Sequence, residues 1–295
     1  MAGPMFKGSY CALVTPFAEG GVDEKAFQGF VQWQVEQGTH GVISCGTTGE
    51  SPTVSHAENR RVTELAIEVC NGRIPVLAGT GSNNTEEAID LTRHAAQAGA
   101  DAALVVTPYY NKPSQEGLYQ HYRAIHDAAE IPIVIYNIPG RCIVDMSVET
   151  MARLAELPRI IGVKDSTGDV VRPFETRRAM GADFSQMSGE DAAVLPFLAM
   201  GGHGCISVTA NVAPALLSQM HEAWMRGDLV TAQSINERLM PLHAAMFCEP
   251  NPAPAKYGLN LLGLIGEAVR LPVVPLSDAA KRQVREAMTH AGLLN

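Results

Sequence analysis

Short apolar runs alternate with longer segments of helical period along the first three quarters of the chain. Each run is followed by a polar loop and then by a stretch whose apolar positions recur every three to four residues. Continuous apolar runs are typical of parallel strands that are buried on both faces. The eight runs are Tyr10–Val14, Gly41–Ser44, Ile74–Ala78, Ala102–Val106, Ile133–Tyr136, Ile160–Val163, Phe184–Met187 and Gly204–Ser207. The pattern predicts an α/β fold, most economically a closed (β/α)8 TIM barrel, with an open doubly wound sheet as the alternative.

Several helix boundaries carry local signals. Ser55 with Glu58, and Asn84 with Glu87, have the spacing of a capping box, in which each side chain bonds the other residue's backbone amide. Glycines stand where three of the helices are expected to end: Gly38, Gly72 and Gly99. These signals support the alternation of strands and helices.

The strand pattern stops near Arg226, and the remainder of the chain reads as helices. The expected helices are Leu229–Phe247, Ala255–Leu264 and Ser277–Ala291, with Ser277 as a cap. We therefore expect two domains, a catalytic barrel over residues 1–226 and a C-terminal helical extension over residues 227–295.

Composition and charge narrow the classes of function. Hydrophobic residues make up 46% of the 295 positions, but runs such as Ala192–Met200 are far shorter than the ~20 residues of a membrane span. A formal charge of −9 disfavours nucleic acid and anionic membranes as partners. The first ten residues lack the pattern of a secretory signal, so we expect a cytoplasmic protein.

Cysteines and histidines give no sign of a metal centre. The six cysteines include no CxxC pair, and the nine histidines include no HExxH motif. We expect reduced thiols and no bound metal. A P-loop motif is also missing, and Gly79-Thr80-Gly81 lacks the third glycine of a dinucleotide fingerprint, which disfavours nucleotide cofactors.

Of the six lysines, only Lys164 directly follows an expected strand, at the end of a barrel where catalytic residues gather. An apolar surrounding disfavours the ammonium form and leaves an amine that can form a Schiff base with a keto group. Tyr136 ends the preceding strand and could pass protons to and from that amine. The alternatives are a solvated lysine, or one paired with Asp165, and a tyrosine that only packs.

Three loops carry further polar groups. Gly46-Thr47-Thr48-Gly49-Glu50-Ser51 offers backbone amides and hydroxyls that suit a small carboxylate. Arg141, which follows Pro139-Gly140, has the planar fork that binds carboxylates, although a surface salt bridge is the alternative. Thr107 to Pro113 carries two tyrosines, Tyr109 and Tyr110, on a loop bracketed by prolines.

Taken together, these motifs resemble the pyruvate-dependent class I aldolases and lyases of the dihydrodipicolinate synthase and N-acetylneuraminate lyase type. The resemblance spans nearly the whole chain and rests on Gly46-Thr47-Thr48-Gly49-Glu50, Tyr136-Asn137-Ile138-Pro139 and Gly162-Val163-Lys164-Asp165. The segments that are similar to the synthase branch are residues 107–113, the turn at 139–141, and residues 188–191, 201–207 and 249–252.

The resemblance implies a reaction. Pyruvate forms a Schiff base with Lys164, and the resulting enamine attacks L-aspartate 4-semialdehyde to give 4-hydroxy-tetrahydrodipicolinate, an intermediate of lysine and diaminopimelate biosynthesis, without a cofactor. The implied catalytic residues are Lys164, Tyr136, Thr47, Thr48 and Tyr110. The implied substrate-binding residues are Thr47, Thr48, Arg141, Gly189 and Ile206.

The resemblance also implies assembly and regulation. Tyr110 would reach a neighbouring subunit's site, which implies a homo-oligomer, commonly a tetramer built as a dimer of dimers. A lysine-feedback site would include Ser51, His56, Asn83, Glu87 and Tyr109. Asn59 stands where lysine-sensitive members often have histidine, which argues against inhibition by lysine.

Two other functions stay open at this point. A sister enzyme would cleave or form a keto-deoxy sugar acid or sialic acid with pyruvate, and a paralogue would bind a keto acid without turning it over. Arg141 favours a compact aldehyde that bears a carboxylate over a sugar acid, whose hydroxyls need matching side chains.

Overall fold

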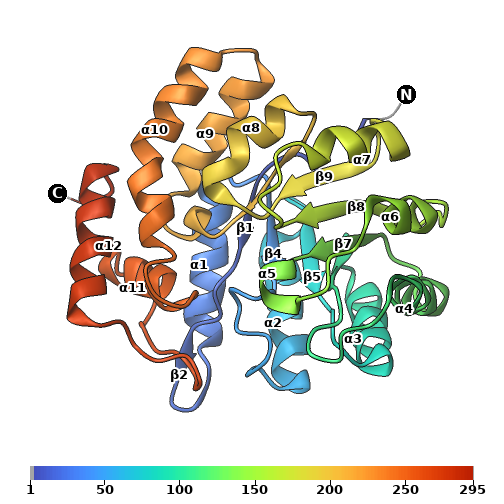
Figure 1. The fold of residues 1–295 in the computed structure, drawn as a ribbon. Helices are drawn as coiled ribbons and strands as arrows, with labels where there is room; N and C mark the ends of the chain where they lie inside the picture. Colours follow the sequence, from blue (N-terminus) through green and yellow to red (C-terminus); the bar gives the residue numbers. More distant parts are fainter. Residues whose placement is uncertain (1–2, 295) are drawn as a thin grey trace. The chain divides into compact units, whose positions relative to one another are not determined.

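The computed structural model describes residues 3–294 and contains a closed barrel of eight strands (Figure 1). The order around the barrel is β1-β10-β9-β8-β7-β6-β5-β4. Strand bounds are β1 (Gly8–Ala12), β4 (Gly41–Ser44), β5 (Val76–Gly79), β6 (Ala102–Val106), β7 (Ile133–Asn137), β8 (Ile160–Asp165), β9 (Ser185–Ser188) and β10 (Gly204–Ser207). The barrel is confirmed, and the open sheet is wrong.

Helices follow the strands along the chain, as the alternation predicts. They are α1 (Glu24–Glu36), α2 (His56–Cys70), α3 (Thr85–Ala98), α4 (Gln115–Ala128), α6 (Val148–Ala155), α7 (Arg172–Met180), α8 (Val194–Ala199) and α9 (Pro214–Met225). Three further helices continue to the C-terminus: α10 (Leu229–Ala245), α11 (Ala253–Leu261) and α12 (Asp278–His290). Ser277 caps α12 by accepting a hydrogen bond from the amide of Ala280, as expected.

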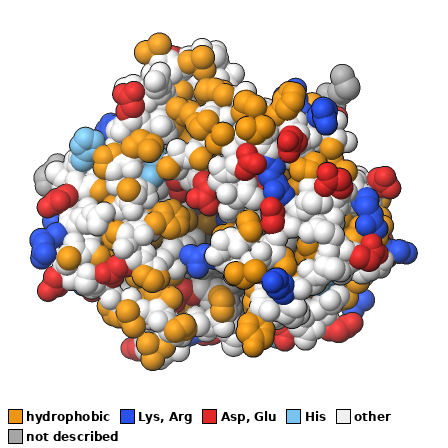
Figure 2. All heavy atoms as spheres, in the orientation of Figure 1, with side chains coloured by type: hydrophobic (Ala, Val, Ile, Leu, Met, Phe, Trp, Pro, Cys, Tyr) orange, Lys and Arg blue, Asp and Glu red, His pale blue; other side chains and the backbone are white. Residues whose placement is uncertain are grey.

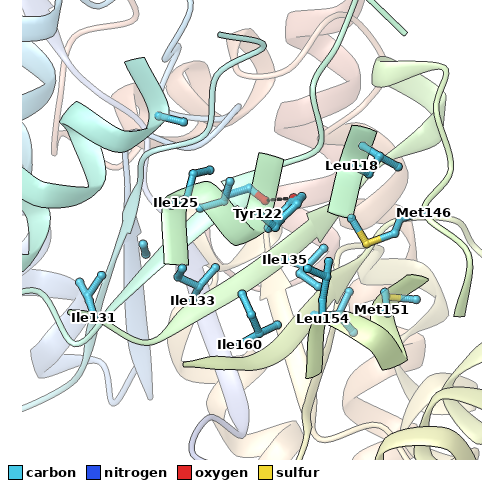
Figure 3. Close-up of a cluster of buried hydrophobic side chains, with 14 of the residues drawn as sticks. Leu118, Tyr122, Ile125, Ile131, Ile133, Ile135, Met146, Met151, Leu154 and Ile160 are labelled. Atoms are coloured by element: carbon cyan, nitrogen blue, oxygen red, sulfur yellow. Dashed lines mark hydrogen bonds between the residues drawn. The ribbon is translucent and has the colours of Figure 1, made fainter. Parts of the chain in front are cut away.

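Two compact units make up the chain. One consists of Val76–Ile206 with the segment that ends at Lys7, and the other of Gly8–Pro75 with the segment that begins at Ser207. Figure 3 shows the core of the first unit, in which Tyr122 of α4 lies beside Ile133 of β7, and the Tyr122 hydroxyl donates to the carbonyl of Val105 at 2.7 Å. In the second unit α9 and α10 lie side by side (Figure 1). The domain boundary between residues 226 and 227 stays a prediction.

One of the two capping boxes forms. The Ser55 hydroxyl accepts from the amide of Glu58, and a Glu58 carboxylate oxygen accepts from the amide of Ser55. The second prediction is wrong, because Asn84 accepts from the amide of Glu86, while the Glu87 carboxylate is bonded by the Ser82 hydroxyl at 2.8 Å. Ser82 therefore competes successfully for the carboxylate that the box would need.

The sequence pattern did not predict several short strands and helices. Two-residue strands β2 (Phe17–Ala18) and β3 (Gly21–Val22) pair antiparallel, and a four-residue helix α5 (Pro139–Cys142) carries Arg141. Two single turns of 3-10 helix, η1 (Asp191–Ala193) and η2 (Thr209–Asn211), also occur. Strand β8 continues to Asp165, so Lys164 lies within a strand instead of after one.

Figure 2 shows acidic, basic and hydrophobic side chains interspersed over one face of the molecule. Within residues 3–294, no helix has the length and apolar character of a membrane span. All six cysteines lie within the described residues as thiols, outside any disulfide, and five of them are buried. Burial raises the pKa of the Cys45 thiol to about 12, so this group stays protonated at neutral pH.

Candidate active site

Strand register places Tyr136 and Lys164 side by side. Parallel pairing of β7 with β8 sets Tyr136 opposite Lys164 and Asn137 opposite Asp165. Because successive side chains of a strand point to opposite faces, the first pair shares one face and the second pair shares the other. The Nζ of Lys164 lies 4.1 Å from the centroid of the Tyr136 ring, and both side chains are buried.

Asp165 pairs with an arginine instead of with Lys164. Its Oδ2 lies 3.2 Å from Nε of Arg172, and its Oδ1 accepts hydrogen bonds from the amide and hydroxyl of Thr167. Among the described residues, Lys164 has no carboxylate within ion-pair distance. Of the two alternatives for this lysine, both pairing with Asp165 and full solvation are therefore wrong. We call Lys164, Tyr136, Asp165 and Arg172 the Lys164 cluster.

A glycine lets the chain approach this lysine closely. A Cβ at Gly189 would collide with the Ser166 hydroxyl and would lie 3.1 Å from Cε of Lys164. The amide of Gly189 donates to the carbonyl of Asp165 at 2.7 Å, so the backbone group that Gly189 can offer a ligand is its carbonyl oxygen. Burial, followed by repulsion from Asp191, raises the pKa of the neighbouring Glu190 carboxyl.

In the second unit, the loop after β4 carries Thr47 and Thr48. Thr48 is buried, and its Oγ1 accepts a hydrogen bond from Nδ2 of Asn251 at 2.9 Å. The loop is tight at Gly49, where a Cβ would lie 3.1 Å from Cα of Cys45 and 3.2 Å from the carbonyl oxygen of Leu13. Only glycine fits such a close approach of backbone to backbone without displacing it.

Glu50 ties this loop to the C-terminal part of the same unit. Its backbone is left-handed, with φ of 56°. One carboxylate oxygen lies 2.5 Å from Nζ of Lys256, and the other accepts from the amide of Arg270 at 3.0 Å. Lys256 also donates to the carbonyl of Ala268 at 2.7 Å. We call Glu50, Lys256, Arg270 and Phe17 the Glu50 cluster.

Cations flank the Phe17 ring in the Glu50 cluster. Nζ of Lys256 lies 4.0 Å and the guanidinium carbon of Arg270 4.1 Å from the ring centroid, which adds cation–π attraction to the ion pairs. Burial lowers the pKa of Lys256 to about 8, against the opposing effect of Glu50. A pKa of about 8 leaves this amine protonated at pH 7, where it balances the charge of Glu50.

Other predicted site residues differ in exposure. Arg141 on α5 is exposed, and its charge acts on the carboxyl of Glu190. Tyr110 is 94% exposed and left-handed, with φ of 68°. Ile206 of β10 is fully buried, so any contact with a ligand would come from its backbone.

The predicted feedback residues fall into both units. In the first, the Asn83 side chain donates to the carbonyl of Tyr109 at 3.2 Å, and Glu87 accepts from Ser82. In the second, Ser51 follows Glu50, and His56 is exposed at the start of α2. Asn59 of the same helix is buried.

The strand register sets the buried Lys164 opposite Tyr136, and comparison with known proteins identifies the family. The family model of the dihydrodipicolinate synthetase family matches residues 5–291. The chain belongs to the dihydrodipicolinate synthetase family.

Members of the dihydrodipicolinate synthetase family resemble the chain over their full length. A 4-hydroxy-tetrahydrodipicolinate synthase of Rhodospirillum centenum is 63% identical over 98% of this chain and 100% of that protein. The crystal structure of dihydrodipicolinate synthase from Aquifex aeolicus is 43% identical, with a TM-score of 0.96 over 98% of this chain and 99% of that one. The chloride-inhibited dihydrodipicolinate synthase from Acinetobacter baumannii, complexed with pyruvate, is 46% identical, with a TM-score of 0.95 and the same coverage.

The sequence did not connect this loop with the residues that hold it, although Asn251 lies in a segment, 249–252, that resembles the synthase branch. Asn251, Lys256 and Arg270 contact the loop, yet they lie more than 200 positions from it along the chain. One signal was available, since Lys256 stands in the apolar stretch Ala253–Leu261 without an acidic residue nearby. A buried lysine of this kind needs a carboxylate partner from elsewhere in the chain.

Within residues 3–294, no group of three His, Cys, Asp or Glu side chains could hold a metal ion.

Proposed function

We propose that the protein condenses pyruvate with L-aspartate 4-semialdehyde to give 4-hydroxy-tetrahydrodipicolinate, a step of lysine and diaminopimelate biosynthesis. The observation that carries the proposal is the buried Lys164 amine, free of a carboxylate partner among the described residues and 4.1 Å from the Tyr136 ring. The names of the relatives favour this condensation over the reaction of a sugar acid.

The first steps use the Lys164 cluster. The unprotonated Nζ of Lys164 attacks the keto carbon of pyruvate to give a carbinolamine, which loses water to form a protonated imine. The imine withdraws electrons, so the methyl group of pyruvate releases a proton and becomes an enamine carbon. Tyr136 lies beside the amine and carries the protons that these steps take up and release.

The later steps form the product. The enamine carbon attacks the aldehyde carbon of the semialdehyde, and the aldehyde oxygen takes a proton to become the 4-hydroxyl. The amino group of the semialdehyde then attacks the imine carbon and closes the ring, and Lys164 leaves as the free amine. One water is released for each pair of substrates, and no external cofactor takes part.

Two further sites would hold the carboxylates of the substrates. Thr47 and Thr48 would bind the carboxylate of pyruvate through backbone amides and hydroxyls, and Tyr110 with one of these threonines would complete the proton relay. Arg141 would bind the carboxylate of the aldehyde substrate in a charge-assisted pair. Gly189 and Ile206 would supply backbone groups at the wall.

Trapping tests the covalent step directly. Pyruvate and borohydride are added to the native protein, and the modified peptide is mapped by mass. We expect the reduced pyruvyl group on Lys164 and not on Lys256, the other buried lysine, whose amine is bonded by Glu50. Protein that stays unmodified would overturn the proposal. In a coupled assay, turnover of a sugar acid instead of aspartate semialdehyde would show that the second substrate is a different compound.

Assembly is part of the proposal. An aromatic side chain that is 94% exposed, as Tyr110 is, supports contact with another subunit, so we propose a homotetramer in which Tyr110 enters a neighbouring subunit's site. Light scattering coupled to size exclusion would give the mass of the assembly. A mass of 31.5 kDa, that of one chain, at working concentration would contradict it.

Regulation and place in the cell complete the proposal. Asn59, which stands in α2 where lysine-sensitive members often have histidine, supports a protein that L-lysine does not inhibit, and assays with and without lysine test this. We place the protein in the cytoplasm, with the barrel over residues 1–226 and the helical extension over 227–295.

A further inference from the structure

The segment between α10 and α11 delivers a side chain to the loop that carries Thr48. Asn251 stands between Pro250 and Pro252, whose rings restrict the backbone on both sides. Its side chain is only 7% exposed, and its Nδ2 lies 2.9 Å from Oγ1 of Thr48. The two residues are 203 positions apart, so this contact depends on the fold of the whole second unit.

The direction of this hydrogen bond fixes the polarity of the Thr48 hydroxyl. An amide nitrogen only donates, so Thr48 uses a lone pair of Oγ1 to accept and keeps its single proton for another acceptor. Among residues 3–294, the one side-chain hydrogen bond found for Thr48 is the one it accepts from Asn251. The Thr48 hydroxyl is therefore oriented as a free donor, as an anionic ligand requires.

A second polar atom at this place also lacks a partner within residues 3–294. Oδ1 of Asn251 is buried and has no hydrogen-bond partner in the described part of the chain. A buried amide oxygen without a partner is unfavourable, so a hydrogen-bond donor such as a water is expected to bond it, and the carboxylate of pyruvate, which only accepts, is not. The unused proton of Thr48 and the unused oxygen of Asn251 lie on two residues that contact each other.

The Glu50 cluster holds the backbone on the other side of Thr48. A left-handed conformation is unfavourable for a residue other than glycine, and Glu50 keeps it through its bonds to Lys256 and to the amide of Arg270. The hydroxyl of Thr15 donates to the carbonyl of Gly49 at 2.8 Å. The loop is thus fixed at Thr48, Gly49 and Glu50 before a ligand arrives.

We propose that Asn251 is a positioning residue for pyruvate: it holds the Thr48 hydroxyl as a donor toward the carboxylate of pyruvate, on a loop whose backbone is anchored by the Lys256–Glu50 pair. The inference rests on the proposed function, because it assigns the ligand of the loop from that reaction. Asn251 acts through Thr48 and needs no contact with the reacting atoms.

Two variants of Asn251 separate positioning from packing. Asn251→Ala removes the donor, and the loss of one neutral hydrogen bond predicts a KM for pyruvate about 3- to 10-fold higher. Asn251→Asp keeps the shape but turns the donor into an acceptor that takes the Thr48 proton, and its charge repels pyruvate. The Asp variant should therefore raise the KM for pyruvate further, about 10- to 100-fold.

A double-mutant cycle tests the route through Thr48. Thr48→Val removes the hydroxyl with little change in volume, so adding Asn251→Ala to it should raise the KM for pyruvate no further. The KM for aspartate semialdehyde should stay within about twofold in each variant, because that substrate binds elsewhere. Additive effects of the two changes would overturn the inference.

Asn260→Ala serves as the matched control. Its Nδ2 donates to the carbonyl of Ile265 at 3.1 Å, within the same C-terminal part of the chain but away from the loop. This variant should lose some thermal stability and keep the KM for pyruvate. If Asn260→Ala raises that KM as much as Asn251→Ala does, Asn251 has only a structural role.

Failure of this inference and failure of the proposed function would give different experimental results. A native protein that neither forms the imine nor turns over the two substrates would end the proposed function. A native protein that does both, with Asn251 variants whose KM for pyruvate is unchanged, would overturn this inference alone.

Discussion

Two buried lysines of this protein have opposite surroundings. Lys164 is 6% exposed and lies over the ring of Tyr136, with no carboxylate at ion-pair distance among the described residues. Lys256 is fully buried, 2.5 Å from the Glu50 carboxylate, and donates to a backbone carbonyl. The Lys164 amine has no carboxylate partner to hold it, whereas the Lys256 amine is held by Glu50 and by the carbonyl of Ala268. Two lysines of similar burial therefore differ in their partners, which is the difference expected between the proposed nucleophile and a structural cation.

The largest effect is expected when Lys164 loses its amine. Lys164→Ala removes the nucleophile, so condensation should fall at least ~1,000-fold, while the unfolding transition stays close to that of the native protein. Lys256→Met is the companion variant and should still form the reduced adduct on Lys164. Trapping on Lys256 in the Lys164→Ala variant would break the distinction between the two lysines.

The next effect concerns stability. Lys256→Met leaves the Glu50 carboxylate buried without its partner, and breaking such a pair costs about 3–5 kcal/mol. Adding Glu50→Gln removes the charge as well, so the double variant should be more stable than Lys256→Met alone. Urea unfolding of the three proteins measures both differences. If Lys256→Met is as stable as the native protein, the Lys256–Glu50 pair does not anchor the loop.

A smaller change is expected at Arg141. Arg141→Ala removes a charge-assisted pair worth about 1.5–3 kcal/mol, so the KM for aspartate semialdehyde should rise about 10- to 100-fold. The KM for pyruvate should change little, and Arg153→Ala, which removes an exposed arginine paired with Glu116, is the control. An equal rise in the KM for both substrates would contradict the assignment of Arg141 to the aldehyde site.

The smallest effect concerns acid stability beside the Glu50 cluster. The Arg270 guanidinium donates to both oxygens of Glu58, and this hydrogen bonding lowers the pKa of Glu58 to about 2. A lowered pKa in the folded state gives stability that is complete above the ordinary value near 4.5 and is lost as the pH falls toward 2.

Glu58→Gln keeps an acceptor for the amide of Ser55 and removes the charge. The variant should be less stable than the native protein at pH 7 by about 1 kcal/mol, a small value because the pair is partly exposed. This difference in stability should shrink as the pH falls from about 5 to 3.5. Thermal unfolding across this range measures it. A difference that does not change with pH would contradict the role of the Arg270 pair.

The pairing of Lys164 with Tyr136 could be predicted from the sequence because its signals are local, whereas Arg172, which takes Asp165 as its partner, was not predicted. The end of each apolar run in the sequence indicates where a strand ends. Lys164 and Tyr136 stand near the ends of neighbouring strands. The Glu50 cluster could not, because nothing near Glu50 indicates that its partners stand at positions 256 and 270. The Asn84 box failed for a different, local reason, because the Ser82 hydroxyl donates to the Glu87 carboxylate. Strands of two residues, such as β2 and β3, are too short for any period to appear.

The 203 positions between Thr48 and Asn251, and the 220 between Glu50 and Arg270, have a consequence for biosynthesis. A ribosome completes the loop early but delivers its supports only near the end of translation. Nascent chains should therefore remain unable to capture the keto acid until almost the entire polypeptide has emerged.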